Sequence, residues 1–239
     1  MFLRELSLKD IPSDVFEDYP FCIPSIRNLD KLDLKNSVTF FVGENGTGKS
    51  TLLEAIAYQT GFNTAGGGRH NHFELGMSGS ALGEYLRLSW MPKVTNGFFL
   101  RAETFYDFAS HIDDLGPDSL QYYGGKSLHQ QSHGEAFLSL FTNRFGKNGI
   151  YLLDEPEAAL SPLRQMALLK VIHDLESSGK AQFIIATHSP ILMAHPGAKI
   201  LNFNGQCIEN IEYEDTDHYI ITKDFLNSRD RYLRELFKD

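Results

Sequence analysis

The chain of 239 residues carries 22 Lys and Arg against 31 Asp and Glu, which gives a net charge of −9 at pH 7. This length fits one α/β domain with a small insert and excludes a separate substrate domain. No apolar run approaches the about 20 residues of a membrane span, and the charged Arg4 and Glu5 in the N-terminal segment argue against a signal peptide.

The first part of the chain predicts a strand, a glycine-rich loop and a helix in immediate succession. Residues 2–8 alternate like an edge strand, and residues 38–42 (VTFFV) form an apolar run typical of a buried parallel strand. Residues 43–50 (GENGTGKS) match the pattern G-x-x-x-x-G-K-[ST], whose backbone N–H groups surround phosphates. A helical pattern follows over residues 50–57, so a helix dipole points its positive end at the phosphate site. The residues predicted to bind nucleotide here are Gly43, Glu44, Asn45, Gly46, Thr47, Gly48, Lys49, Ser50 and Thr51.

Two more strands and a polar insert are predicted in the middle of the chain. The strands are residues 86–90 and 97–101, and residues 111–131 are expected to form short helices and loops. After the insert, apolar residues recur at helical spacing over residues 134–145. The helix start at Ser132 and Gly134 predicts an anion site, while the alternative is a Ser N-cap on an ordinary core helix.

A pair of adjacent carboxylates ends the next predicted strand, residues 150–154. Asp154 and Glu155 would be costly to bury without a cation or hydrogen-bonding partners. A phosphate-bound Mg²⁺ supplies such a cation: Asp154 is placed to help hold it, and Glu155 to polarise the attacking water. The alternative is that these acidic residues simply open a helical turn and complement its dipole.

The remaining elements complete an α/β pattern. A helix is predicted from Ser161 as N-cap to about Glu176, ending at Gly179, and strands are predicted at residues 182–186, 199–204 and 208–213. Alternating strands and helices indicate a mainly parallel central sheet, with the N-terminal strands as an antiparallel flank.

A surface helix is predicted at the C-terminal end, over residues 228–238. Its charges are of mixed sign, and Tyr232, Leu233, Leu236 and Phe237 are expected to face inward.

These segments, in this order, resemble a soluble ABC-type ATPase, close to the compact ATPases grouped with the RecF, SMC and OLD proteins. The resemblance extends from about Phe2 to about Asn204. Residues 43–50 are similar to the Walker A loop and residues 150–155 to the Walker B strand with its catalytic Glu. His188 resembles the switch histidine, although a histidine at a strand end is also common as hydrogen-bonded structure.

Two other motifs of the family are present in altered form. Residues 131–135 (QSHGE) resemble the signature L-S-G-G-Q, with His133 for the first Gly and Glu135 for the Gln. Residues 158–161 (AALS) resemble the D-loop, with Ser161 where an Asp is usual. The usual Gln between the Walker A helix and the signature is missing, and Glu103 is the candidate to replace it.

The resemblance implies a P-loop NTPase fold, a single domain over residues 1–239 and a helical insert over about 104–148. It implies Glu155, His188 and Lys49 as catalytic residues, and Ser50, Asp154 and Glu103 as ligands of Mg²⁺. Ser132, Gly134 and Glu135 would contact the ATP held by a second copy of the chain. Arg101 would either touch phosphate or bind Glu103.

The predicted function is Mg²⁺-dependent ATP binding and hydrolysis by a switch that dimerises with ATP and acts on an unidentified protein partner. The alternatives are the ATP-binding subunit of a membrane transporter, or a nucleotide-gated interaction module without significant turnover. DNA binding is disfavoured by the net charge. Cys22 and Cys207 offer no disulfide framework, so a cytoplasmic location is expected. Candidates for stacking on adenine are Phe16, Tyr19 and Phe21.

Overall fold

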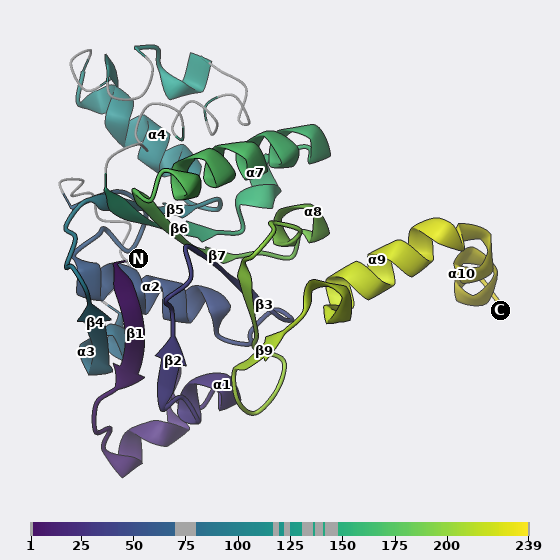
Figure 1. Ribbon diagram of the computed structural model, residues 1–239, viewed down its shortest axis with the longest axis horizontal. Coiled ribbons are helices and arrows are strands. Elements are labelled where there is room, and N and C mark those ends of the chain that lie inside the picture. The colour runs from purple at the N-terminus through teal and green to yellow at the C-terminus, as the bar shows by residue number, and fades with distance from the viewer. Residues whose placement is uncertain are drawn as a thin grey trace.

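The structure is a computed structural model of the chain. It describes residues 2–69, 80–116, 120, 121, 125–130, 136, 141 and 148–238. Figure 1 shows two sheets with helices on both sides and a C-terminal pair of helices that extends away from the body.

The larger sheet has six strands in the order β5-β6-β7-β3-β8-β9. The first five are parallel to one another, and β9 is antiparallel to β8. Their bounds are β3 Val38–Val42, β5 Gly97–Arg101, β6 Gly149–Asp154, β7 Ala181–Ala186, β8 Lys199–Asn202 and β9 Glu209–Ile211. Every residue of β3, β5, β6 and β7 is buried, as expected of strands covered on both faces. The prediction of a mainly parallel central sheet is therefore confirmed.

The smaller sheet is antiparallel and has the order β2-β1-β4. Its strands are β1 Leu3–Leu8, β2 Lys31–Asp33 and β4 Leu86–Trp90. The predicted antiparallel flank is thus confirmed. The sequence prediction missed β2, because three residues carry no periodic signal and only their pairing with β1 defines the strand.

Helices cover the two faces of the parallel sheet. The α-helices are α1 Pro24–Arg27, α2 Lys49–Thr60, α3 Ala81–Tyr85, α4 Phe105–Asp114, α7 Pro162–Ser177, α8 Pro190–Met193, α9 Asp217–Asn227 and α10 Arg229–Leu236. The 3-10 helices are η1 Ser13–Glu17, η3 Leu128–Gln130, η4 Pro156–Ala159 and η5 Tyr213–Asp215.

Two hydrophobic cores lie on opposite faces of the parallel sheet. Phe40 of β3 joins the core that includes α4 and α7, and the next residue, Phe41, joins the core that includes α2 and β1. This alternation follows from the period of two residues in a strand. The parallel sheet is therefore the middle layer, with α4 and α7 on one side and α2 on the other (Figure 1).

One buried side chain connects the two sheets. Gln182 of β7 accepts the N–H groups of Phe2 and Leu3 through Oε1, at 3.0 and 2.8 Å. Its Nε2 donates to the carbonyls of Leu3, Leu34 and Asn36 at 2.8, 2.6 and 3.2 Å. Because Gln182 is fully buried, these bonds satisfy both its amide and backbone groups that would otherwise be buried without partners.

The C-terminal helices differ from the prediction. The helix itself is present as α10, but Leu236 is 68% and Phe237 76% exposed, so the expected inward face is wrong for these residues. Neither α9 nor α10 contains a buried residue. Tyr232 packs against Phe225 of α9, but Leu236 and Phe237 are not covered by any element in the described part of the chain.

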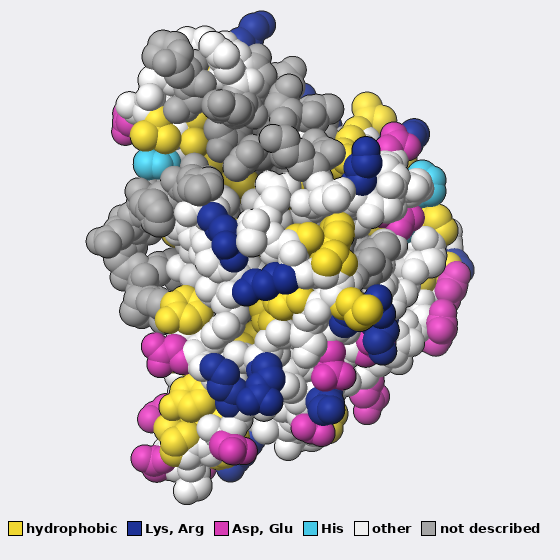
Figure 2. Space-filling model, turned by 60° about the vertical axis from the view of Figure 1, so that its left-hand side comes forward, with side chains coloured by type: hydrophobic (Ala, Val, Ile, Leu, Met, Phe, Trp, Pro, Cys, Tyr) yellow, Lys and Arg dark blue, Asp and Glu magenta, His cyan; other side chains and the backbone are white. Residues whose placement is uncertain are grey.

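Positive charges are dispersed on the face of the molecule that Figure 2 shows. On the face shown in Figure 2, Lys and Arg side chains are scattered among other residues and form no continuous strip. Among the described residues, no helix is both long and apolar enough to cross a membrane. Cys22 and Cys207 are exposed free thiols.

Candidate functional site

The glycine-rich loop connects β3 to α2, as its sequence predicts. Gly43, Gly46 and Gly48 have φ values of 138°, 80° and 97°, which L side chains rarely adopt. At Gly43 the fit is also close, because a Cβ atom there would lie 2.7 Å from Oδ1 of Asn204. The loop therefore needs glycine for both its backbone conformation and its packing.

Lys49 is buried and folded onto its own loop. Its Nζ donates to the carbonyl oxygens of Gly43 at 2.7 Å and Glu44 at 2.8 Å. Burial lowers the pKa of Lys49, and the nearby carboxylates of Glu155 and Asp154 oppose that shift. Two neutral carbonyl acceptors thus hold an ammonium group beside the first helical turn of α2.

Ser50 and Asp154 bring a hydroxyl and a carboxylate together. Oγ of Ser50 donates to Oδ1 of Asp154 at 2.8 Å. Asp154 is only 6% exposed, and burial raises its pKa to about 6, although the hydrogen bond from Ser50 and the charge of Arg101 act in the opposite direction. Oxygen ligands of this kind suit Mg²⁺. Burial disfavours the charged form of the Asp154 carboxylate, and a cation bound beside it would stabilise that form.

Glu155 adopts an unusual backbone conformation directly after β6. Its φ of 49° makes it the only non-glycine residue with positive φ among the described residues. That conformation costs about 1–2 kcal/mol and is typical of functional sites, where the surrounding structure enforces it. Here the N–H of Glu155 donates to the carbonyl of Ala186 at 2.9 Å, which fixes the turn against the end of β7.

His188 follows β7 and faces Glu155. Its Nε2 lies 3.5 Å from Oε1 of Glu155 and makes no hydrogen bond within the described part of the chain. Its backbone N–H donates to Oε1 of Glu157 at 2.5 Å. Burial lowers the pKa of His188, and the positive charge of Lys49 adds to this effect. The imidazole is therefore favoured in its neutral form, with one ring nitrogen directed at the carboxylate.

The structure adds two residues that the sequence prediction missed. Nδ1 of His188 is 2.8 Å from Nε2 of His218, which lies in the first turn of α9. Asn204 accepts the N–H of Glu44 at 2.6 Å and donates to Oδ2 of Asp217 at 3.0 Å. The start of α9 is thus connected both to the loop and to His188. No local pattern in the sequence marks His218, since its partner is 30 residues away.

Arg101 is at the centre of a group of carboxylates at the end of β5. It forms an ion pair with Glu54 at 3.1 Å and another with Glu103, and its Nε lies 3.7 Å from Oδ2 of Asp154. Burial raises the pKa of Glu54, and Arg101 opposes that shift. The sequence left two possibilities for Arg101, a contact with phosphate or an ion pair with Glu103, and the structure shows the ion pair with Glu103.

The aromatic candidates occupy different positions. Phe21 is buried in the core with its ring edge-on to Tyr85, and Phe16 packs on the same core. Tyr19 is exposed, and its hydroxyl lies 3.0 Å from Oγ1 of Thr51. Only Tyr19 of the three lines the hollow next to the loop.

Two pockets that share lining residues lie next to the glycine-rich loop. The larger, of about 400 Å³, is lined by Ser50, Arg101, Ala102, Glu103, Asp154, Glu155, Ala158 and Ala159. The smaller, of about 210 Å³, is lined by Tyr19, Ile23, Asn45, Gly46, Gly48, Lys49, Ser50, Thr51 and Glu155. Ser50 and Glu155 line both pockets, so predicted residues from the loop, from the end of β5 and from the end of β6 lie around the same two hollows, whereas His188 lines neither.

The signature residues Ser132, Gly134 and Glu135 lie outside the described residues. Ala136 and Phe141, which follow them, are described and are buried in the core with α4 and α7. The proposed position of the signature relative to a second copy stays a prediction.

Two family models match separate parts of the chain. A model described as "AAA domain" matches residues 22–86, which include the glycine-rich loop. One described as "AAA domain, putative AbiEii toxin, Type IV TA system" matches residues 128–194, which include Asp154, Glu155 and His188. A comparison with curated proteins gives no match.

Solved structures resemble the whole chain in fold. One, described as "a putative metal-chelate type ABC transporter" in an inward-facing conformation, has 18% identity and a TM-score of 0.53, over 93% of this chain and 88% of that one. An ATP-binding cassette of an ABC transporter, MJ1267, has 14% identity and a TM-score of 0.51 over 100% of both chains. An SMC head bound to the C-terminal winged-helix domain of ScpA has 15% identity and a TM-score of 0.50, over 88% of this chain and 98% of that one. At these identities the likeness concerns the fold alone.

Proposed function

We propose, from the ABC-type P-loop ATPase fold of this chain, that it binds ATP with Mg²⁺, hydrolyses it, and dimerises with the nucleotide to act on a protein partner. The observation that carries the proposal is the hydrogen bond of 2.8 Å between Ser50 and Asp154, beside the strained Glu155. A hydroxyl and a carboxylate at the end of a phosphate loop are the ligands that this class of enzyme uses for Mg²⁺.

Each residue around the loop has a distinct role in the proposal. Lys49 exchanges its two carbonyl acceptors for oxygens of the β- and γ-phosphates. Ser50 and Asp154 would hold Mg²⁺, with Glu103, which lines the same pocket, as a further candidate ligand. Mg²⁺ bound there supplies positive charge to the phosphate oxygens. Tyr19, exposed beside Thr51, is the best-placed residue to stack on adenine.

Glu155 and His188 act at the γ-phosphate end of the site. The Glu155 carboxylate accepts a hydrogen bond from the attacking water and takes its proton. Nε2 of His188, which lacks a hydrogen bond of its own, contacts the γ-phosphate and detects its loss. Because burial and Lys49 favour the neutral imidazole, this contact is made by a ring that can donate through Nε2 when Nδ1 accepts.

The dimer in this proposal rests on the signature motif. The loop of each copy would hold one ATP, and the γ-phosphate of that ATP would be bound by the signature residues of the other copy, Ser132, Gly134 and Glu135. Two ATP molecules would therefore lie between the two chains.

The first test is Glu155→Gln, with Lys49→Ala for comparison. Glu155→Gln should bind ATP, sediment as a dimer in ATP and lose phosphate release by about 10²-fold or more. Lys49→Ala should fail to bind.

A mixing experiment separates the dimer from the chemistry. Lys49→Ala and Ser132→Arg should each be inactive alone. When mixed, heterodimers contain one site with both defects and one intact site, so phosphate release should return.

Turnover at the wild-type level in Glu155→Gln would remove the catalytic assignment. A Ser132→Arg variant that is active alone, or a mixture without recovery, would remove the shared site.

A further inference from the structure

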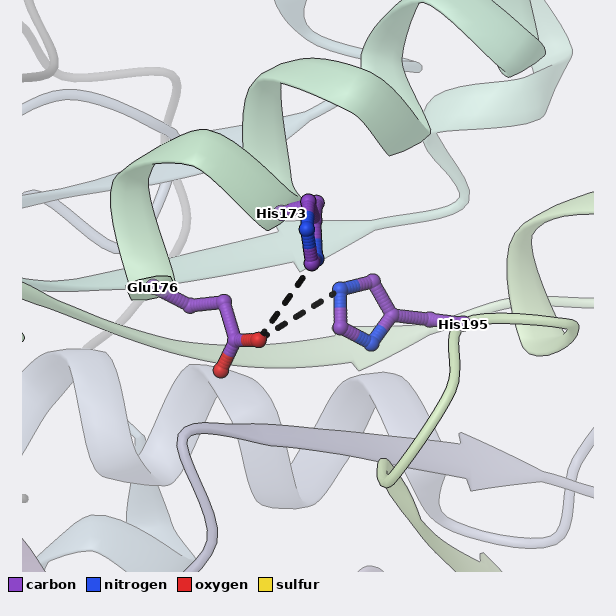
Figure 3. Close-up of side chains that lie close together, drawn as sticks. All are labelled: His173, Glu176 and His195. Atoms are coloured by element: carbon purple, nitrogen blue, oxygen red, sulfur yellow. Dashed lines mark ion pairs between the residues drawn. The ribbon is translucent and has the colours of Figure 1, made fainter. Parts of the chain in front are cut away.

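Two histidines and a glutamate lie close together near the C-terminal end of α7. His173 and Glu176 lie three residues apart on this helix, and His195 lies shortly after α8 (Figure 3). Oε1 of Glu176 is 3.8 Å from Nδ1 of His173 and 4.0 Å from Nε2 of His195. One nitrogen or oxygen of each residue falls within 4.8 Å of the others. None of the three lines either pocket at the phosphate loop.

His195 is buried, and the backbone of Pro196 is the polar group closest to serving its ring as a hydrogen-bond partner. Its side chain is 1% exposed, and within the described part of the chain neither Nδ1 nor Nε2 makes a hydrogen bond of normal geometry. A buried imidazole of this kind loses its hydration without replacement, which is unfavourable. In Figure 3 one nitrogen of the ring faces the carboxylate of Glu176. A ligand placed between them would satisfy it.

A fourth residue orients the carboxylate. The hydroxyl of Ser37 donates to Oε2 of Glu176, so Oε1 is left to face the two imidazoles. Metal sites commonly use a hydrogen bond of this type to fix the rotation of a coordinating carboxylate. The contact also comes from a different segment, immediately before β3, so the orientation of Glu176 does not depend on α7 alone.

We propose that His173, Glu176 and His195 bind one divalent transition-metal ion of the Zn²⁺ class. Two imidazoles and one carboxylate are a ligand set that Zn²⁺ uses, with water in the fourth position. Mg²⁺ and Ca²⁺, which prefer oxygen ligands, do not suit it. Bonds of about 2.0–2.1 Å place tetrahedral ligand atoms roughly 3.4 Å apart, so the present cluster needs a small contraction. His173 can move toward the other two, because its side chain is half exposed. The separation of 4.0 Å between Glu176 and His195 shortens by a shift of the Glu176 side chain, which is 19% exposed.

The ion would join two elements next to the nucleotide site. The other end of the α7–α8 contact is already bonded, because Oγ of Ser189 donates to Oε1 of Gln165 at 2.5 Å. Ser189, which precedes the first residue of α8, directly follows His188, so α8 begins next to a residue of the proposed nucleotide site. The ion would hold the segment after α8 to the last turn of α7. It thereby stabilises the support of His188 without taking part in hydrolysis.

The experiment uses the full chain without an affinity tag, treated with chelator and then titrated with Co²⁺ or Zn²⁺. Wild type should bind one equivalent of Co²⁺ with the visible absorption of a four-coordinate ion, and Zn²⁺ should raise its melting temperature. His173→Ala and Glu176→Gln should weaken Co²⁺ binding by at least about 10²-fold, and Ser37→Ala by roughly tenfold. Mg²⁺ at the same concentrations should not compete.

Two controls distinguish this site from others in the chain. His70→Ala/His72→Ala removes the two histidines that are closest in the sequence, and His218→Ala removes the partner of His188; both should leave Co²⁺ binding unchanged. ATP should still raise the melting temperature of His173→Ala, which shows that the variant is folded and that the nucleotide site is intact. Binding that is equal in wild type and His173→Ala, or that disappears in His70→Ala/His72→Ala, would overturn the proposal.

Discussion

Nδ1 of His188 and Nε2 of His218 lie 2.8 Å apart, so one imidazole donates to the other across the end of the parallel sheet. Only one of the two nitrogens can carry the shared proton. Burial lowers the pKa of both rings, which favours a neutral pair. The tautomers of the two rings are therefore coupled: a neutral His188 is protonated at Nε2 when His218, in the first turn of α9, donates, and at Nδ1 when His218 accepts.

The first prediction concerns this pair. His218→Ala removes the partner of Nδ1 and leaves the His188 ring free to rotate, so kcat should fall roughly tenfold, equivalent to about 1.4 kcal/mol. KM for ATP should change little, because within the described residues the hydrogen bond of the His218 ring goes to His188 and not to the loop. Steady-state phosphate release measures both constants. His218→Gln retains a hydrogen-bonding group and should recover most of kcat; an unchanged kcat in His218→Ala would contradict the positioning role.

The second prediction concerns the backbone of Glu155. Its φ of 49° is strained for any residue with a Cβ atom but not for glycine. Both Glu155→Gly and Glu155→Ala should abolish turnover, but the glycine variant should be about 1 kcal/mol more stable. Urea denaturation without nucleotide measures the difference. An alanine variant as stable as the glycine variant would mean that the strain is relieved elsewhere.

The third prediction is a pH dependence of stability from Asp154. Burial raises its pKa in the folded chain to about 6 from an ordinary value of 3.8, so the folded state binds the proton more tightly. The cost of holding the charged form is absent below pH 4 and complete above pH 6. Relative to Asp154→Asn, the unfolding free energy of wild type should fall by about 3 kcal/mol between these limits.

Denaturant titrations at several pH values, with chelator and without nucleotide, measure this difference. Wild type alone carries the titrating carboxyl, so effects of pH on other groups cancel in the comparison. A difference that stays constant between pH 4 and pH 7 would show that the Asp154 carboxyl is already compensated in the empty site.

The fourth prediction separates the partners of Arg101. Arg101→Met leaves the largely buried Glu54 without its cation and should cost about 3 kcal/mol of stability. Adding Glu54→Gln should recover much of that loss. Glu103 is two-thirds exposed, so Glu103→Gln should cost under about 1 kcal/mol.

Glu103→Gln also tests the Mg²⁺ assignment. The Mg²⁺ concentration that gives half-maximal phosphate release should rise if Glu103 is a ligand, while stability hardly changes. An unchanged Mg²⁺ requirement would assign Glu103 to Arg101 alone, which is the contact that the structure contains.

The parts of the fold that follow from local pattern could be predicted from the sequence. The strand, loop and helix around Lys49 need only residues adjacent in the chain, and so do the buried strand before Asp154 and the Ser161-Pro162 start of α7. The order of these motifs was enough to predict a mainly parallel sheet.

The features that depend on distant pairing could not be predicted. His218 has no meaning as a site residue until α9 is placed against His188. The three residues of β2 become a strand only through β1. Leu236 and Phe237 show the opposite case: the sequence marks an apolar face correctly, but it carries no information on whether another element covers that face.

The position of α9 has a mechanical consequence. Asp217 and His218, in its first turn, are bonded to Asn204 and His188, while the rest of the helix extends from the body without a buried residue (Figure 1). Its 11 residues correspond to a length of about 16 Å. A rotation of about 10° at the base would displace the far end by roughly 3 Å. A small rotation at the contacts with Asn204 and His188 would thus become a larger displacement where α10 begins.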